Sequence, residues 1–375
     1  MAFKFELVHA SKKSRARVGK ITTPHGVIDT PNFFGVGTNG TLKALDNAAV
    51  HEIGLQLMFC NTYHLMLQPG TETVRQAGGL HRFINRDMPI ITDSGGFQVF
   101  SLAYGSVADE LKSRGTKKQD GHVLKINEDG VLFRSYRDGA KVLLTPETSI
   151  AAQKDLGADI IIPFDELPPY HIADVDLKTS LDRTHRWEER SLNAHLANPQ
   201  NQAMYSVIHG GVHKELRKIS CDFLTALPFD GFAIGGSMGK TKAEMIEMLT
   251  FTLPLLPIEK PNHLLGIGDL ESIDQCVPLG IDTFDSSYPT RAARHGILLT
   301  QKGPLKIMKS DNARAFNAPE EGCPCSTCRQ FSLAYLHHLF KAREMTCMTL
   351  ATVHNLHFMV DLMRRYRQQI LKGDL

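Results

Sequence analysis

The sequence lacks the features that would place this chain in a membrane or in the secretory pathway. No run of eighteen apolar residues occurs among its 375 residues, and the N-terminal residues contain no apolar signal-type segment. Tandem repeats and low-complexity tracts are also absent. Four of the seven cysteines, Cys60, Cys221, Cys276 and Cys347, are scattered and form no disulfide framework. We therefore expect a globular protein of the cytoplasm that makes no contact with a membrane.

Excess charge of one sign is absent from the chain as a whole, because 42 Lys and Arg balance 40 Asp and Glu. The balance changes along the chain. From Arg291 to the C-terminus, thirteen Lys and Arg stand against six Asp and Glu, a net charge of +7, so the first 290 residues carry about −5. A basic C-terminal segment suggests a polyanionic partner held at one end of the molecule. A solvated helix face around Arg364 to Arg367 is the alternative explanation.

The other three cysteines form the pattern C-x-C-x2-C at Cys323, Cys325 and Cys328. Cys323 and Cys325 are too close in sequence for an unstrained disulfide. Three thiolates at this spacing and one distant histidine, for which we favour His354, can surround a tetrahedral zinc ion. Four protein ligands leave no open coordination position, so this zinc is predicted to be structural. The alternatives for the fourth ligand are Cys347 and His357.

Short, largely apolar runs recur through the first 290 residues, and each has the composition of a strand buried on both faces. Helical patterns lie between them. Eight strands alternating with helices predict an α/β protein with a (β/α)8 TIM barrel. A doubly wound open sheet is the alternative, but no phosphate-type glycine loop follows the first run. The predicted strands are 31–37, 56–60, 89–92, 159–164, 203–208, 231–234, 263–265 and 281–284, and the predicted helices include 41–53, 146–156, 177–196, 214–227 and 241–253.

Two segments interrupt this alternation. Residues from about 103 to 145 contain three alternating runs around Glu-Asp-Gly and Arg-Asp-Gly turns, which predicts an antiparallel β insertion. The cysteine-rich segment comes after the last predicted strand. We therefore expect a catalytic barrel over residues 1–303 and a helical, zinc-binding subdomain over residues 304–375.

Three aspartates end predicted strands, namely Asp93, Asp165 and Asp285. A lone aspartate in this position is usually a helix N-cap. Three of them converge on one cavity if the barrel prediction is right, because catalytic residues of such barrels lie where strands meet the following loops. Carboxylates that face each other across a cavity suit glycosyl transfer, in which one attacks the anomeric carbon and another moves the proton of the leaving group.

Several motifs occur in order along the chain, namely Asn61-Thr-Tyr-His-Leu65, Asp93-Ser-Gly-Gly-Phe-Gln98, His209-Gly-Gly211, Ala233-Ile-Gly-Gly236, Phe284-Asp285 with Pro289-Thr-Arg291, and the cysteine–histidine set. Together they resemble the motifs of the queuine tRNA-ribosyltransferase family, also called tRNA-guanine transglycosylases. The resemblance implies a zinc-containing barrel enzyme that exchanges the wobble guanine in the anticodon loop of tRNA for a free 7-deazaguanine base. It implies no energy cofactor, and it implies a homodimer.

The resemblance also implies roles for individual residues. Asp285 matches the nucleophile that forms a covalent ribosyl-enzyme intermediate, and Asp93 matches the general acid and base. Asp165 matches the acid that binds the N1–H and N2 edge of guanine, and the Gly236 amide matches the donor to O6. The remaining matches are Phe97 and Leu265 as the two walls that sandwich the base, and Arg291 and Arg294 as contacts to the anticodon.

Three residues depart from the family pattern. His209 stands where a glutamine usually donates to the base carbonyl, a role that an imidazole N–H can still serve. Leu167 replaces a cysteine of the bacterial pattern or a valine of the eukaryotic one, and Gly239 replaces a bacterial valine. Because glycine enlarges the pocket beside the 7-substituent, we expect queuine as the incoming base, with its 7-aminomethyl precursor as the alternative. A non-catalytic partner subunit of the family and an unrelated barrel glycosidase are further alternatives.

Overall fold

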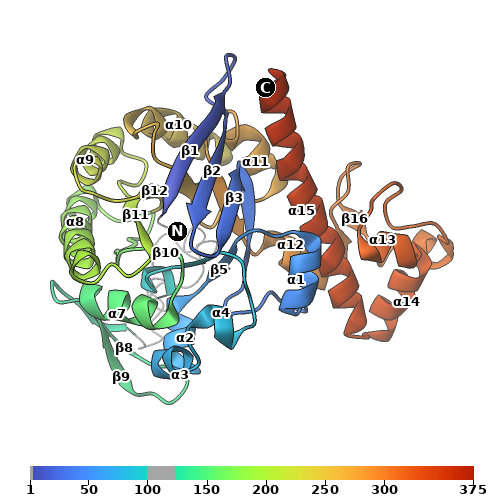
Figure 1. Ribbon diagram of the computed structural model, residues 1–375, viewed down its shortest axis with the longest axis horizontal. Coiled ribbons are helices and arrows are strands. Elements are labelled where there is room, and N and C mark those ends of the chain that lie inside the picture. The colour runs from blue at the N-terminus through green and yellow to red at the C-terminus, as the bar shows by residue number, and fades with distance from the viewer. Residues whose placement is uncertain (1–2, 99–122) are drawn as a thin grey trace.

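The computed structural model describes residues 3–98 and 123–375 (Figure 1). Eight parallel strands close into a barrel, which confirms the predicted architecture and excludes an open sheet. The last strand of the barrel pairs with the first, from Thr283 beside Asn32 to Ser286 beside Gly35. The barrel strands are β4 Asn32–Val36, β5 Met58–Cys60, β6 Ile90–Thr92, β10 Ile160–Ile161, β11 Ala203–Ile208, β12 Gly231–Ile234, β13 Asn262–Leu264 and β14 Thr283–Ser286.

Helices follow the barrel strands and cover the outside of the barrel (Figure 1). Two of them begin with capping boxes, at Thr145 before α7 and at Thr241 before α10, which satisfy the first free amides of each helix. The elements of this layer are α1 Asn47–Ile53, α2 Thr62–Leu67, α3 Thr71–Gln76, α4 Leu80–Phe83, α7 Pro146–Leu156, α8 Asp174–Ala197, α9 Lys214–Thr225, α10 Lys242–Thr252, η1 Leu253–Leu255, α11 Leu270–Cys276 and α12 Tyr288–Arg294.

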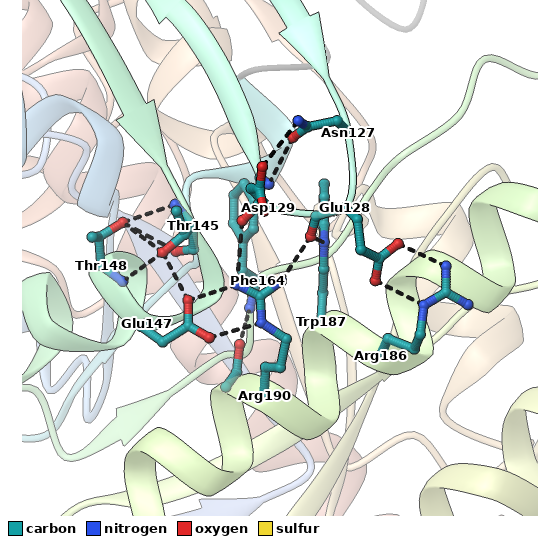
Figure 2. Close-up of polar contacts among 12 residues, drawn as sticks. Asn127, Glu128, Asp129, Thr145, Glu147, Thr148, Phe164, Arg186, Trp187 and Arg190 are labelled. Atoms are coloured by element: carbon teal, nitrogen blue, oxygen red, sulfur yellow. Dashed lines mark hydrogen bonds and ion pairs between the residues drawn. The ribbon is translucent and has the colours of Figure 1, made fainter.

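The predicted antiparallel insertion is present as a sheet of β7 Val123–Ile126, β8 Val131–Arg134 and β9 Lys141–Leu144. Its earlier part, residues 103–122, lies outside the described residues. Figure 2 shows how α8 holds this sheet: Arg186 pairs with Glu128, and Trp187 donates to the Glu128 carbonyl at 2.9 Å. Trp187 also stacks on Phe164 at 4.9 Å. The insertion is thus joined through Trp187 to the residue that precedes Asp165.

An N-terminal antiparallel sheet, which the sequence did not predict, closes one end of the barrel. It consists of β1 Lys4–Ala10, β2 Arg17–Thr23 and β3 Gly26–Thr30. Ile21 and Ile28 pack in one core with residues of the barrel strands, among them Ile160 and Ala203, the first residues of β10 and β11. This sheet therefore covers the N-terminal ends of the strands, and the opposite, C-terminal ends are left for a site.

The C-terminal segment packs on the barrel through its last helix, α15 (Thr346–Lys372), which contacts α1, α12 and β4 (Figure 1). Its apolar residues belong to the same core as those of the barrel. In the described part of the chain, no helix combines the length and the apolar character needed to cross a membrane. The other elements of the segment are β15 Ile297–Leu298, β16 Leu305–Lys306, η2 Ser310–Arg314, α13 Ser326–Gln330 and α14 Leu333–Ala342.

Candidate active site and metal centre

Asp93 directly follows β6 and is buried among three hydrogen-bond donors. Its Oδ1 accepts from the Thr62 amide at 2.8 Å, and its Oδ2 accepts from Asn61 Nδ2 at 2.6 Å and from Gln98 Nε2 at 2.9 Å. Burial raises the pKa of Asp93 to about 6, and the charge of Asp165 adds to this shift, although the three donors oppose it. This carboxyl can therefore gain and lose a proton near neutral pH.

Asp165, in the loop after β10, is joined to the loops that follow β6 and β11. Ser94 Oγ donates to its Oδ1 at 2.9 Å, and His209 Nε2 lies 2.9 Å from its Oδ2. A Cβ on Gly96 would lie 2.6 Å from the Asp165 carbonyl oxygen, so only glycine fits this close approach. The structure thus brings Asp165 and His209 into direct contact.

The loops after β11 and β12 are held together by Arg217 of α9. Its side chain is fully buried and donates to the carbonyls of Ile208 at 2.8 Å and Gly235 at 3.0 Å. Burial lowers the pKa of Arg217 to about 10, which leaves the guanidinium charged at neutral pH. Gly236 has a φ of +77°, and a Cβ there would lie 3.0 Å from His209 Nδ1. Arg217 therefore sets the positions of both His209 and Gly236.

Asp285 lies in β14, on the other side of the barrel from β10 in the strand order. Its side chain is buried, and its Oδ1 accepts from the Gly266 amide at 2.7 Å. His263 Nε2 lies 3.1 Å from the same oxygen. The other oxygen, Oδ2, has no hydrogen-bond partner within residues 3–98 and 123–375.

The residues expected to sandwich the base are accessible. Phe97 is 49% exposed just after Gly96, and Leu265 is half-buried beside Gly235. A cavity adjoins His209 and Gly236 and extends toward Tyr170, Ser180 and Thr184. The residues that line this cavity do not include Leu167 or Gly239. Gly239 instead has a φ of +107°, and a Cβ there would lie 2.6 Å from Glu244 Cβ.

The two arginines expected to contact RNA lie in α12, which begins just after β14. Arg291 is exposed, whereas Arg294 is half-buried. Arg294 Nη1 is buried without a hydrogen-bond partner in the described structure. Arg291 is the more accessible of the two for a phosphate near Asp285.

The predicted metal ligands form one cluster. His354 Nδ1 lies 3.8 Å from Cys323 Sγ, 3.6 Å from Cys325 Sγ and 3.3 Å from Cys328 Sγ. A tetrahedral ion with ordinary zinc bond lengths separates sulfur and nitrogen ligands by about 3.6 Å. His354 Nε2 lies 2.8 Å from the Leu299 carbonyl, which fixes the tautomer that leaves Nδ1 for a metal. The cluster includes neither Cys347 nor His357.

A second group, His25, His81 and Asp159, lies at the closed end of the barrel. His25 Nδ1 is 2.7 Å from Asp159 Oδ1, and His81 Nε2 is 3.1 Å from Oδ2. The two rings stack with centroids 3.5 Å apart and an interplanar angle of 13°. Parallel rings cannot both direct their in-plane lone pairs at one ion. We therefore interpret this group as two histidines that each hydrogen-bond to one carboxylate oxygen of Asp159.

Three residues of the site were missed by the sequence interpretation. Ser94 binds Asp165, Arg217 binds two site loops, and His263 binds Asp285. Ser94 stood inside a motif that had already been noted. His263 had a weaker signal, a histidine in an otherwise apolar strand, and Arg217 had none because it resembles any basic helix residue.

Comparison with known proteins gives the family. The family model described as "Queuine tRNA-ribosyltransferase" matches residues 11–375. A protein of Protochlamydia amoebophila with that name is 78% identical over 368 residues, which cover 98% of this chain and 95% of that protein. Proteins of the same name from Chlamydia caviae and Chlamydia trachomatis serovar D are 54% and 55% identical, with 100% and 99% of each chain covered. The chain therefore belongs to the queuine tRNA-ribosyltransferase family.

Proposed function

We propose that this enzyme is a tRNA-guanine transglycosylase, which exchanges the wobble guanine of tRNA for a free 7-deazaguanine base. The observation that carries the proposal is the difference between two buried carboxyls at the open end of the barrel. Asp93 has a pKa of about 6, which suits proton transfer. Asp285 has one oxygen held by two donors and another oxygen left without a partner among the described residues, which suits nucleophilic attack.

The proposed reaction is a double displacement. In the first step, Asp285 Oδ2 forms a bond to C1′ of the ribose while the C1′–N9 bond breaks, and Asp93 gives a proton to the departing guanine. In the second step, Asp93 takes the N9 proton of the incoming base. That nitrogen attacks C1′, and Asp285 leaves with the bonding electron pair. Two inversions at C1′ retain the configuration of the ribose.

In the proposed complex, Asp165 accepts from the N1–H and N2 edge of the base, and Phe97 and Leu265 stack on its two faces. The Gly236 amide donates to O6. His209 Nε2 is occupied by Asp165, and Nδ1 is the ring atom beside Gly236. His209 therefore donates to O6 as well only when its ring carries both protons.

We propose queuine as the preferred incoming base, with the 7-aminomethyl precursor as the alternative. The support is the cavity that adjoins His209 and Gly236, which lies beside the proposed base-binding residues and which Ser180 and Thr184 also line. Gly239 does not line this cavity. Its part in base selection, and that of Leu167, is therefore indirect.

The Cys323, Cys325, Cys328 and His354 cluster fits a closed tetrahedral ion, which we propose to be a structural zinc within a subdomain over residues 304–375. Such an ion would tie the loop before α13 to α15 and take no part in the reaction. We further propose that Arg291 and Arg294 contact the anticodon loop and that the enzyme is a homodimer. The cytoplasm is the compartment that the tRNA substrate favours.

Exchange of radiolabelled guanine into tRNA tests this function directly. Wild type should incorporate guanine, and free queuine should compete more strongly than the precursor. Asp285→Asn should lose nearly all turnover and the enzyme–tRNA adduct that survives a denaturing gel. An inactive wild type would favour a non-catalytic partner subunit, and an undiminished adduct in Asp285→Asn would place the nucleophile elsewhere.

A further inference from the structure

A histidine without exposed surface contacts the proposed nucleophile. His263, in β13, stacks against Phe34 and Phe59, with ring centroids 5.6 and 6.2 Å away. An imidazole in such apolar surroundings is costly unless both nitrogens are hydrogen-bonded. Nε2 meets Asp285 Oδ1 at 3.1 Å, and Nδ1 meets Thr283 Oγ1 at 2.9 Å. Both partners come from β14, in which Thr283 is the register neighbour of His263.

The partners of the two ring nitrogens determine which nitrogen of His263 carries the proton. A carboxylate accepts only, so His263 must carry a proton on Nε2 to bind Asp285. In the neutral ring, Nδ1 then accepts from the Thr283 hydroxyl. The alternative acceptor for that hydroxyl, the Asn262 carbonyl, is farther away at 3.2 Å. The Asp285 carboxylate thus selects the tautomer, and the Thr283 hydroxyl, which can turn its proton from the Asn262 carbonyl to Nδ1, satisfies the other ring nitrogen.

We propose that His263 is a positioning residue for Asp285, an inference that rests on the function proposed above. Together with the Gly266 amide, it restrains Oδ1 and leaves Oδ2 directed at the ribose. It also acts on the energetics of the two steps. A donor binds an anionic carboxylate more strongly than the carbonyl oxygen of an ester, so His263 favours free Asp285 over the ribosyl-enzyme.

This difference in hydrogen-bond strength affects the two displacements in opposite directions. Negative charge on Asp285 disappears when the adduct forms and returns when the adduct breaks down. Loss of the His263 donor should therefore slow breakdown more than formation, and should shift the equilibrium toward the adduct. A residue that only supports the fold would lower the amount of adduct instead.

The test measures adduct formation and discharge with tRNA and guanine on denaturing gels. In His263→Leu, the rate of discharge by guanine should fall roughly 10- to 100-fold, as expected for a lost hydrogen bond to a charged group. The adduct fraction at a fixed guanine concentration should rise. His263→Gln, which keeps a donor, should recover most of the discharge rate. Phe59→Leu, which disturbs the ring packing alone, should leave the adduct fraction unchanged.

Thr283→Val keeps the imidazole and provides a second test if His263→Leu does not fold. This variant should also raise the adduct fraction, by a smaller factor than His263→Leu. An unchanged or lower adduct fraction in both variants, with normal exchange in wild type, would overturn this inference alone. Absence of exchange and adduct in wild type would instead overturn the proposed function.

Discussion

Asp93 and Asp285 are both buried carboxyls at strand ends, yet their partners prepare them for different chemistry. Asp93 accepts three hydrogen bonds from Asn61, Thr62 and Gln98, but burial outweighs them and its pKa rises to about 6. Asp285 accepts on a single oxygen both of the hydrogen bonds that the described residues donate to it. Environment at the scale of individual atoms therefore separates the proposed proton carrier from the proposed nucleophile.

The pKa of Asp93 predicts opposite pH dependences for the two half-reactions. Adduct formation needs protonated Asp93, so its rate should fall as pH rises through about 6. Adduct discharge needs the carboxylate, so its rate should rise over the same range. Single-turnover measurements between pH 5 and 8 check this. Gln98→Leu removes a donor that stabilises the charged form and should move both midpoints upward by about one unit.

Gly239 yields a prediction about strain rather than pocket size. Its φ of +107° and its closeness to Glu244 predict that Gly239→Ala and Gly239→Val both lower the free energy of unfolding, by roughly 1–3 kcal/mol. The ratio of kcat/KM for queuine and precursor should change little in Gly239→Ala. Gly303 has a similar φ of +101° and open space around it, so Gly303→Ala measures the cost of the backbone strain without a steric contact such as that with Glu244. A fully stable Gly239→Ala would contradict this account.

Among the elements, α9 has the most direct influence on the site because Arg217 joins it to two loops. The guanidinium is buried and donates to the carbonyls of Ile208, the last residue of β11, and Gly235, which follows β12. The antiparallel insertion is linked to the site less directly, through α8. Trp187 of this helix donates to the Glu128 carbonyl of the insertion and stacks on Phe164, which precedes Asp165 (Figure 2). Helices on the outside of the barrel thus determine where Asp165, His209 and Gly236 lie.

Replacing Arg217 tests this role of α9. Arg217→Met would leave buried carbonyls without donors, so the free energy of unfolding should fall by roughly 2–4 kcal/mol. The KM for the incoming base should rise more than kcat falls, because the loops after β11 and β12 hold the proposed base-binding residues. Denaturant unfolding and steady-state kinetics provide the two readouts. Lys218→Met, an exposed neighbour on the same helix, should leave both nearly unchanged.

At the scale of the whole molecule, α15 joins the candidate metal-binding cluster to the barrel. His354 lies in this helix, and residues from Val353 to Ile370 share the core of the barrel. The barrel and the cysteine-rich segment should therefore unfold together. A change that disrupts the cluster should also disturb the packing of α15 against α1 and α12.

Metal removal should accordingly destabilise the entire protein. Chelation should shift a single thermal transition downward by on the order of 5 °C or more, and exchange activity should be lost with the fold. Calorimetry combined with metal analysis measures both. Cys325→Ala should bind less than one equivalent of metal. Cys347→Ala, a buried cysteine outside the cluster, should keep full occupancy, and an equal loss in that variant would mean that the ligand set is wrong.

Much of this fold and site follows from the sequence by itself, because the relevant signals are local. Strands buried on both faces have apolar runs, and all eight were identified from them. The proposed metal ligands Cys323, Cys325 and Cys328 lie within six residues of one another. Asp93, Asp165 and Asp285 could be placed at one end because parallel strands in a barrel all terminate on the same face.

Tertiary structure decided the features that depend on residues far apart in the chain. β1 was missed because most of its residues are exposed and give no apolar run. The pairing of His263 with Asp285 depends on the register of β13 against β14, and a one-residue shift would direct these side chains to opposite faces. Packing of α15 on the barrel likewise depends on contacts over three hundred residues apart. Only the closed barrel brings such residues together, so only the structure could assign their partners.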